Sequence, residues 1–370
     1  MSAKPKNDAG SRPAILVNGR YRVHRITGVQ RYAHEIVLRL GDEVELCTPR
    51  SAKGAVGHLW EQTVLPLMAR GRLLWSPSGS GPLGYNRQVV TFHDLFPIEF
   101  PECYSAAYAR WYGFAMPALA SRAVHLIAVS EYTKSRIVAL LGRAPEDITV
   151  IHNGCHTAGR ASENEIGAAA SALKLPSRRY VLSLSSLEKR KNLPALLQAW
   201  IEIYRDLPED TWLVLAGPRV EESVYGKQQI GTDLPRVLFT GYVPEQHLAG
   251  LYSGASLFVF PSLAEGFGLP LLEAMSCGVR SISSRTSSLP EVGGEVVEYI
   301  DPQNPAQIGH AILKHFRLFP GEPEPYAPGI ERASKFTWDA AAAKTRNVLG
   351  RALGAGRRVL ATELNRTSAL

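Results

Sequence analysis

Two carboxylates and a glycine-rich turn lie together in one short stretch of the sequence. Glu265 and Glu273 flank the segment Gly-Phe-Gly-Leu-Pro, and an apolar run that predicts a buried strand ends shortly before it, at Phe260. Pro270 suits the first turn of a helix, and Gly278 suits the position just after its end. The helix N-terminus would then present the backbone amides of Gly266, Phe267, Gly268 and Leu269. Such amides, together with the helix dipole, favour an anion.

An anion alone does not explain two carboxylates at this place. Glu265 and Glu273 can accept hydrogen bonds from hydroxyl groups, so a sugar nucleotide fits the pair better than phosphate by itself. The alternative is that one glutamate complements the helix dipole and the other is an exposed helical residue. Spacing alone does not separate these two interpretations.

A basic pair, Arg190 and Lys191, follows the first predicted strand of the second half and opens a helix. Cations at a helix N-terminus oppose the dipole, so their placement favours an anionic diphosphate between them. The alternative is a solvated basic loop.

The first half of the chain offers weaker candidates. His93 and Asp94 follow a predicted buried strand, at the carboxyl edge where open α/β sheets bind their ligands. His93 could donate a hydrogen bond to a sugar hydroxyl, and the usual pKa of histidine suits proton transfer; a lone histidine is more often structural. Gly28, which precedes an amphipathic helix, could let the backbone approach a ligand.

Short apolar runs that predict strands recur through both halves. They are 14–18, 44–47, 72–75, 89–92, 125–129 and 148–151, then 180–184, 212–216, 237–239, 257–260, 281–283 and 296–300. Nearly continuous apolar strands are typical of parallel sheets covered on both faces. Helical patterns between them, such as 193–204 and 270–277, complete βαβ units and predict an α/β fold in both halves.

Three further segments have a distinct composition. We expect the boundary between the halves at 157–179, which is rich in Ala, Ser, Gly and Glu. The Pro-rich segment 319–329 predicts a loop, and a basic helix is expected over 340–353.

Composition excludes several classes of protein. Hydrophobic residues make up 45% of the chain and charged residues 20%, as in globular rather than disordered proteins. No apolar run approaches the roughly 20 residues of a membrane-spanning helix. The N-terminus shows no secretory signal, and the four cysteines form no Cys-x-x-Cys pair, which indicates a cytoplasmic protein. The net charge of +7 permits an anionic partner without requiring one.

Several familiar motifs are missing from the sequence. It contains no G-x-x-x-x-G-K-[ST] and no G-x-G-x-x-G after a strand, so P-loop and ordinary dinucleotide sites are not expected. It also has no D-x-D motif, the usual metal site for a diphosphate.

The motifs that are present resemble those of the retaining glycosyltransferases of family 4, which have the GT-B fold. The resemblance spans about residues 13–350 and is strongest at 251–278, where two glutamates are separated by seven residues. Supporting motifs are Leu-Glu-Lys-Arg-Lys-Asn at 187–192, Phe-His-Asp-Leu at 92–95, Ala-Val-Ser-Glu-Tyr-Thr-Lys at 128–134, Ile-His-Asn-Gly at 151–154 and Leu-Pro-Glu-Val-Gly-Gly at 289–294.

This resemblance implies roles for the donor-binding residues. Lys191, with Arg190 beside it, resembles the basic pair that binds the diphosphate of a nucleotide sugar. Glu273 resembles the glutamate that accepts hydrogen bonds from the ribose, and Glu265 the glutamate that faces the transferred sugar. The amides of 266–269 would hold sugar hydroxyls and phosphate.

From the facing domain, the resemblance implies that His93 lies near the reacting sugar and that Gly28 faces the acceptor and the phosphate. The sequence departs from the family in three places. Ser185-Ser186 stands where many members carry Gly-Arg, so one phosphate-binding arginine is either missing or replaced by Arg190. Asn-Gly-Cys-His at 153–156 replaces the common Asn-Gly-Val-Asp, and Arg280 stands at a strand start where the usual proline is lacking.

The resemblance therefore predicts a GT-B enzyme with two Rossmann-like domains whose parallel sheets face a cleft. The expected parts are an acceptor-binding domain at 13–165, a nucleotide-sugar-binding domain at 178–335, and a helix at 336–355 that returns to the first domain. We expect a retaining hexosyltransferase that needs no cofactor or metal and binds no nucleic acid. Likeness to bacterial polysaccharide mannosyltransferases favours GDP-mannose as the donor, in lipopolysaccharide or other surface polysaccharide biosynthesis. The alternatives are a GT-B sugar-nucleotide epimerase, an inverting transferase, and a non-catalytic glycan-binding partner of an active transferase.

The segment 101–122 raises the question of a membrane. Tyr104, Tyr108, Trp111 and Tyr112 share helical spacing and have basic neighbours, as in helices that lie at a membrane interface. The acceptor would then be a glycan linked to polyprenyl diphosphate, and the protein peripheral to the cytoplasmic face of the inner membrane. The alternative is that these aromatic side chains pack inside the acceptor domain.

Overall fold

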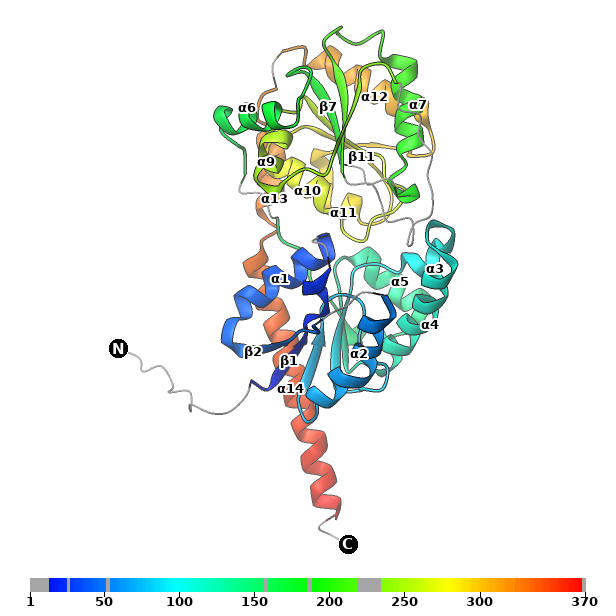
Figure 1. Ribbon diagram of the computed structural model, residues 1–370, viewed down its shortest axis with the longest axis vertical. Coiled ribbons are helices and arrows are strands. Elements are labelled where there is room, and N and C mark those ends of the chain that lie inside the picture. Colours follow the sequence, from blue (N-terminus) through cyan, green and yellow to red (C-terminus); the bar gives the residue numbers. More distant parts are fainter. Residues whose placement is uncertain are drawn as a thin grey trace, which may run out of the picture.

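The structure is a computed structural model that describes residues 13–24, 27–50, 54–155, 159–184, 188–217, 234–321 and 323–367, with side chains to residue 354. Two α/β units lie end to end along the long axis of the molecule (Figure 1). Each unit is built on a six-stranded sheet in which all neighbouring strands are parallel. The predicted α/β fold class is confirmed.

The N-terminal sheet has the strand order β2-β1-β3-β4-β5-β6. Its strands are β1 (Ile15–Asn18), β2 (Val44–Cys47), β3 (Leu73–Ser76), β4 (Gln88–Phe92), β5 (His125–Ala128) and β6 (Ile148–Val150). The α-helices of this half are α1 (Gly28–Leu40), α2 (Gly54–Met68), α3 (Phe96–Glu99), α4 (Ala106–Arg122) and α5 (Glu131–Leu141). Each predicted strand of this half is therefore present, with ends that differ by one residue or none.

Helices cover both faces of this sheet, which explains the apolar strands. Ile15 and Val17 of β1 pack in one cluster with residues of α1 and α14 (Trp338–Thr367), whereas Leu16 packs with Leu65 of α2 on the other face. Because successive side chains of a strand point to opposite faces, a strand covered on both sides is apolar along most of its length. All four residues of β1 are buried.

The C-terminal sheet has the order β12-β11-β10-β7-β8-β9. Its strands are β7 (Tyr180–Leu184), β8 (Trp212–Ala216), β9 (Val237–Gly241), β10 (Leu257–Phe260), β11 (Ser281–Ser284) and β12 (Glu298–Ile300). Its helices are α6 (Glu163–Ala172), α7 (Leu193–Ile203), α9 (Glu245–Ser253), α10 (Leu269–Ser276), α11 (Leu289–Gly293), α12 (Pro305–Leu318) and α13 (Ala327–Ser334). Leu182 packs in the cluster that contains α9 and α10, and Val181 packs with α7 and α12 on the opposite face.

Two segments differ from the sequence-based expectation. The boundary segment 157–179 contains α6, which packs against α9 of the C-terminal half, so the crossing between the halves precedes this helix. Ser162 and Glu165 form a capping box that starts α6. The predicted loop 319–329 ends three residues early, because Ala327-Pro328 begins α13 and proline suits a first helical turn.

The chain crosses between the two halves twice, and the crossings lie side by side. The backbone N–H of Cys155 donates to the carbonyl of Phe336 at 3.0 Å. Beyond Phe336, α14 packs against α1 of the N-terminal half and runs past the end of that domain (Figure 1). Trp338, at the start of α14, is buried in the N-terminal core beside Tyr32.

Trp338→Ala should therefore destabilise the protein by about 3–5 kcal/mol, because it empties a large buried site between α14 and the N-terminal sheet. Urea denaturation, monitored by far-UV circular dichroism and not by tryptophan fluorescence, would measure the change. Arg351→Ala, on the exposed side of the same helix, should change the free energy of unfolding by no more than about 0.5 kcal/mol. Equal losses in the two variants would contradict the packing of α14.

Candidate active site

The strand order of the C-terminal sheet places a crevice beside β7. The chain runs from β7 to β8 and β9 on one side, whereas β10, β11 and β12 lie on the other side. In open α/β sheets, ligands bind outside the carboxyl ends of the strands at such a reversal point. The segments that leave β7 and β10 at this edge contain the predicted residues Arg190 and Lys191, and Glu265 to Leu269.

These two segments are held together by a buried cluster of charges. Lys191 Nζ lies 2.8 Å from Oε1 of Glu265, and Arg190 Nη1 lies 3.0 Å from its Oε2. Arg190 also contacts Glu188 at 2.8 Å and donates to the carbonyl of Ala264 at 2.6 Å. Each oxygen of the Glu265 carboxylate thus faces one cation.

The charges in this cluster fix the protonation of Glu265. Burial alone would raise the pKa of the Glu265 carboxyl, but Arg190 and Lys191 outweigh it and lower that pKa to about 2. Glu265 and the neighbouring glutamate Glu188 in turn raise the pKa of Arg190 above its usual value, against the effect of burial. Glu265 is therefore a carboxylate, and a weak base, at any physiological pH.

The predicted basic pair, Arg190 and Lys191, lies in a short 3₁₀ turn, Lys189–Lys191, and not in the following helix α7. Asn192 follows with a positive φ of 58° and links the loops, because its Nδ2 donates to the carbonyls of Pro261 and Pro302 at 3.1 and 2.7 Å. The turn thus ends before α7 begins, which lets the side chains of Arg190 and Lys191 reach back over the crevice toward Glu265. Residues 185–187, which include the departure at Ser185-Ser186, lie outside the described residues.

The glycine segment lies where the two halves of the chain touch. A Cβ at Gly266 would overlap the carbonyl oxygen of His93, so no larger residue fits there. Gly268 has a φ of 102° and precedes α10, where the sequence predicts a helix start. The amides of Phe267, Gly268 and Leu269 therefore belong to a helix N-terminal turn that faces the N-terminal half.

Glu273 has different partners from Glu265. It is 3% exposed, its Oε1 lies 3.2 Å from Nη1 of Arg31, and its Oε2 accepts a 3.0 Å hydrogen bond from Tyr252. Arg31 comes from α1 of the N-terminal half, so this ion pair crosses between the halves. At the start of α1, a Cβ on Gly28 would lie 3.1 Å from Leu269. The N-terminal turns of α1 and α10 thus face each other.

His93 is a neutral group in this structure. Burial lowers the pKa of its imidazole to about 4, although the Pro77 carbonyl opposes this effect. Nε2 lies 2.8 Å from that carbonyl oxygen, which can only accept, so Nε2 carries the hydrogen and Nδ1 is a hydrogen-bond acceptor. The expected proton transfer by His93 at neutral pH is therefore not supported by its environment, whereas hydrogen bonding is.

Asp94 is a second ionisable group at the contact between the halves. Burial raises the pKa of its carboxyl to about 6, against the attraction of Arg190, and Glu265 and Glu188 add to the increase. Its Oδ1 accepts a hydrogen bond from the backbone N–H of Phe96 at 3.1 Å. A group with this pKa changes its charge within the physiological range.

The start of α5 fastens the glycine segment from the N-terminal side. Ser130 Oγ donates to the carbonyl of Gly266 at 2.6 Å, and Thr133 Oγ1 donates to it at 3.2 Å. The carboxylate of Glu291, from α11, accepts hydrogen bonds from the backbone N–H of Glu131 at 2.9 and 3.0 Å. It also lies 2.5 Å from Nε2 of His152.

Sequence reasoning assigned no role to Arg31 or to these residues around α5. The motifs at 128–134 and 289–294 contain Ser130, Thr133 and Glu291, so a signal was present. Their function in joining the halves depends on contacts over more than a hundred residues of separation, which the motifs alone do not show.

Comparisons with known proteins agree with this geometry. Residues 178–317 match the family model described as glycosyl transferases group 1, and residues 74–158 match that of glycosyltransferase family 4. The O-antigen chain mannosyltransferase B of Escherichia coli is 32% identical over 273 residues, which cover 72% of this chain and 71% of the relative. The chain belongs to glycosyltransferase family 4. It is a nucleotide-sugar-dependent glycosyltransferase.

Other relatives and solved structures agree with the glycosyltransferase assignment. The O-antigen chain mannosyltransferase RfbU of Salmonella typhimurium is 26% identical over 59% of this chain and 57% of the relative. The glycosyltransferase spans about a third of the length of another relative, the serotype-specific mannosyltransferase WbdA of Escherichia coli, with 30% identity over 68% of this chain.

Solved structures show the fold. HepE of Anabaena, in complex with UDP and glucose, superposes with a TM-score of 0.68 at 16% identity, over 91% of this chain and 99% of that one. WaaG, a glycosyltransferase of lipopolysaccharide biosynthesis, gives a TM-score of 0.66 at 15% identity, over 90% and 99%. The GT-B architecture is therefore confirmed, and a transferase is better supported than an epimerase or a non-catalytic partner.

The raised pKa of Asp94 predicts a pH-dependent effect of Asp94→Asn on stability. Because the pKa rises from 3.8 in the unfolded chain to about 6 in the fold, the carboxyl favours the fold below pH 4 and loses this contribution as the pH rises through 6. The free energy of unfolding of the variant should therefore exceed that of the parent by about 1–3 kcal/mol at pH 8, and by much less at pH 4.5. Guanidinium denaturation at both pH values measures the difference; a gain that does not depend on pH would contradict the shift.

Proposed function

We propose that this glycosyltransferase transfers mannose from GDP-mannose, with retention of configuration, to a glycan acceptor of surface polysaccharide biosynthesis. The observation that carries the proposal is the Lys191–Glu265–Arg190 cluster at the reversal point of the C-terminal sheet. The mannosyltransferase names of the relatives support the sugar. In this proposal the C-terminal half binds the donor, and the N-terminal half binds the acceptor.

The donor's diphosphate would bind beside Lys191 and Arg190. Their charge is balanced by Glu265 in this structure, so an incoming diphosphate shares the two cations with that carboxylate. The N-terminal turn of α10, with the amides of residues 266–269, adds hydrogen-bond donors to the same place. Glu273, which already accepts hydrogen bonds through both oxygens, would exchange Arg31 or Tyr252 for the ribose hydroxyls.

These residues also suggest how the reaction is catalysed. Lys191, Arg190 and the α10 amides would stabilise the charge that develops on the departing GDP. We propose that the reaction needs no metal and no cofactor because these cations supply that charge. Within the described part of the chain, no three His, Cys, Asp or Glu side chains form a group that could hold a metal ion.

Glu265 is better suited to binding than to attacking the sugar, because a carboxylate with a pKa of about 2 is a weak base. We therefore propose that Glu265 accepts hydrogen bonds from the hydroxyls of the transferred sugar, and we assign no residue as nucleophile. In the mechanism that we propose, the acceptor attacks from the face that GDP leaves, and the leaving phosphate takes the proton of the acceptor hydroxyl. His93, neutral and with Nδ1 as acceptor, would receive a hydrogen bond from a sugar hydroxyl.

A panel of sugar nucleotides in buffer with EDTA tests the donor. GDP-mannose near 100 times its Kd should stabilise the fold by about 2.7 kcal/mol, whereas UDP-glucose at the same concentration should give a smaller shift in Tm. Lys191→Ala should weaken GDP binding by about 10- to 100-fold, because a charge-assisted bond to phosphate is lost, and should leave guanosine binding unchanged.

Lys189→Ala provides the matched control, since Lys189 donates to the carbonyl of Glu102 and does not contact Glu265 in the described contacts. A stronger response to UDP-glucose would overturn GDP-mannose as the donor. Loss of all turnover in EDTA, restored by Mg²⁺, would overturn the metal-independent reaction.

We also propose that the acceptor is linked to polyprenyl diphosphate and that the N-terminal half contacts the membrane from the cytoplasmic side. Among the described residues, no helix is long and apolar enough to cross a membrane. The four aromatic side chains that the sequence singles out, Tyr104, Tyr108, Trp111 and Tyr112, are half-buried. Tyr104 stacks on Tyr108, and Trp111 packs edge-on against His58 of α2 at 5.1 Å. They are therefore less accessible to lipid than their spacing suggests.

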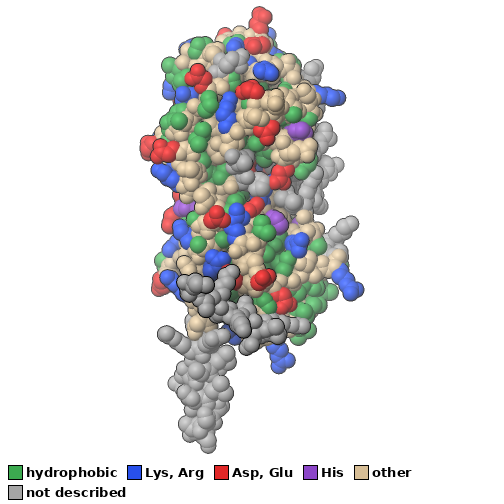
Figure 2. All heavy atoms as spheres, turned by 90° about the vertical axis from the view of Figure 1, so that its left-hand side faces the viewer, with side chains coloured by type: hydrophobic (Ala, Val, Ile, Leu, Met, Phe, Trp, Pro, Cys, Tyr) green, Lys and Arg blue, Asp and Glu red, His purple; other side chains and the backbone are tan. Residues whose placement is uncertain are grey.

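More exposed apolar side chains on α4 and α2 support the membrane proposal better. Phe114 of α4 is 63% exposed and lies 6.4 Å from the Trp111 ring. On α2, Val56, Leu59 and Leu67 are 60–72% exposed. Figure 2 shows hydrophobic side chains gathered at the right of the lower, N-terminal half. Apolar groups with nearby basic residues such as Arg110 suit an anionic lipid surface.

Leu59→Ser with Phe114→Ser should therefore reduce co-sedimentation with vesicles rich in anionic lipid by at least about threefold, since two exposed apolar groups no longer enter the interface. Binding by the parent should fall as salt rises. Leu38→Ser on α1, an equally exposed leucine at 66%, serves as the control. If vesicle binding changes neither with lipid charge nor with the substitutions at Leu59, Phe114 and Leu38, a soluble acceptor is favoured.

A further inference from the structure

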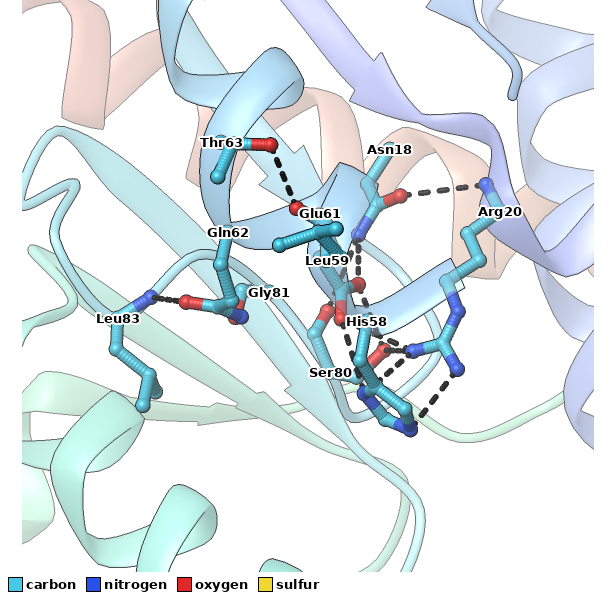
Figure 3. Close-up of polar contacts among 10 residues, drawn as sticks. All are labelled: Asn18, Arg20, His58, Leu59, Glu61, Gln62, Thr63, Ser80, Gly81 and Leu83. Carbon is cyan, nitrogen blue, oxygen red and sulfur yellow. Dashed lines mark hydrogen bonds and ion pairs between the residues drawn. The ribbon is translucent and has the colours of Figure 1, made fainter. Parts of the chain in front are cut away.

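The N-terminal sheet has a reversal point of its own, and it is filled with buried polar side chains. The chain runs from β1 to β2 on one side, whereas β3 and the later strands lie on the other side. Asn18 ends β1, and the segment after β3 includes Ser80; both are fully or almost fully buried, as are Arg20 and Glu61. Figure 3 shows these side chains converging from β1, α2 and the β3–β4 segment.

Glu61 of α2 is the centre of this cluster. Its Oε1 accepts hydrogen bonds from Asn18 Nδ2 at 2.7 Å and from Ser80 Oγ at 2.9 Å, and its Oε2 lies 3.0 Å from Arg20 Nη1. Asn18 Nδ2 also donates to the carbonyl of Ser80 at 3.3 Å. The Glu61 carboxylate, which is 1% exposed, thus holds Ser80 directly and through Asn18.

The next residue of α2 holds the same segment at two further points. Gln62 Nε2 donates to the carbonyl of Gly81 at 3.0 Å, and its Oε1 accepts from the backbone N–H of Leu83 at 2.8 Å. A Cβ at Gly81 would lie 2.8 Å from side-chain oxygens of Gln88 and Ser76, so the segment fits tightly against the strands. Two consecutive side chains of α2 therefore fasten residues 80–83.

The other end of this segment carries the carbonyl that orients His93. Pro77, three residues before Ser80, accepts the hydrogen bond from His93 Nε2 at 2.8 Å. That bond selects the tautomer with Nδ1 unprotonated. The ring is otherwise packed edge-on against Tyr32 at 4.9 Å, a contact that does not select a tautomer.

We propose that Glu61, with Gln62, is a positioning residue for His93: it fixes the 77–83 segment, whose Pro77 carbonyl sets the tautomer and orientation of the imidazole. The inference rests on the proposed role of His93 at the transferred sugar. Glu61 touches neither substrate nor His93 and acts only through the segment between them.

The chemistry of the cluster indicates positioning rather than stability alone. Burying Glu61 and Arg20 costs desolvation energy that their attraction does little more than offset, so apolar residues of the same size would stabilise a fold equally well. Such residues would remove the carboxylate that accepts from the Ser80 hydroxyl and from the Asn18 amide, and would leave the segment less firmly held. A displacement of about 1 Å at a reacting group is enough to slow a reaction about 100-fold.

The test is Glu61→Gln in the full-length enzyme, with ¹⁵N-labelled histidine. Whichever way the new amide turns, its NH₂ group faces a donor, either Arg20 or the Asn18 Nδ2. We expect kcat to fall about 10- to 100-fold and GDP affinity to stay unchanged. The ¹⁵N signals of His93, assigned by their loss in His93→Ala, should move from the Nε2–H form toward a mixture of tautomers.

Ser80→Ala, which leaves the Glu61–Arg20 pair intact, should move the same signals in the same direction by a smaller amount. It carries the test if Glu61→Gln does not fold. Thr63→Ala is the control on α2, since its hydroxyl donates only within the helix, to the carbonyl of Leu59 at 2.7 Å. His93 signals that stay unchanged in both test variants would overturn the inference, whatever happens to the rate.

The failure of the proposed function would look different. If His93→Ala keeps the parent rate, the role of His93 at the sugar is wrong, while the ¹⁵N signals still report whether Glu61 sets its tautomer. A fall in kcat equal to that of Glu61→Gln in the Thr63→Ala control would also overturn the inference, because it would show a general disturbance of α2.

Discussion

The close approach of the Gly266 and His93 backbones is the constraint on which the rest of the site depends. No side chain fits between these two residues, so they bring the start of α10 against the end of β4. Several other contacts between the halves lie around this point: Arg31 to Glu273, Ser130 and Thr133 to the Gly266 carbonyl, and Glu291 to the start of α5. With the backbones so close, charged side chains at the contact are removed from water and must find partners within the protein.

The protonation of the carboxyl groups at this contact depends on their removal from water. Glu265 stays ionised because Lys191 and Arg190 each contact one of its two carboxylate oxygens, whereas burial raises the pKa of Asp94, which forms no ion pair in the described contacts. The pKa values of these two buried carboxyls are thus shifted in opposite directions, because both Arg190 and Lys191 lower that of Glu265, whereas burial and the nearby carboxylates outweigh Arg190 at Asp94. A ligand with two phosphates would compete for the same cations, and its arrival would change the charge balance for both carboxyls.

The sequence was sufficient to predict the strands and to single out residues that lie together after β7 and β10, but it did not predict the contacts that these residues make. Strands such as Ile15–Asn18 are covered on both faces and therefore stand out as apolar runs. Pro328 looked like part of a loop although proline also starts helices, and α6 was missed although Ser162 and Glu165 give its capping signal. That Lys191 pairs with Glu265, or Arg31 with Glu273 from 242 residues away, depends on how loops and domains pack, which local pattern does not encode.

The paired crossings near Cys155 and Phe336 have a mechanical consequence. Two chain segments that run side by side and are hydrogen-bonded to each other act as one two-stranded strap, which resists sliding and twisting of the halves but permits bending. We therefore expect the halves to separate by bending about this pair of crossings. The widest gap opens on the opposite side, where Lys189 reaches the Glu102 carbonyl and Arg190 lies 4.8 Å over the ring of Phe96. In the donor complex that we propose, a nucleotide sugar entering there would meet Arg190 and Lys191 first, and its diphosphate would bind before the two halves close on the sugar.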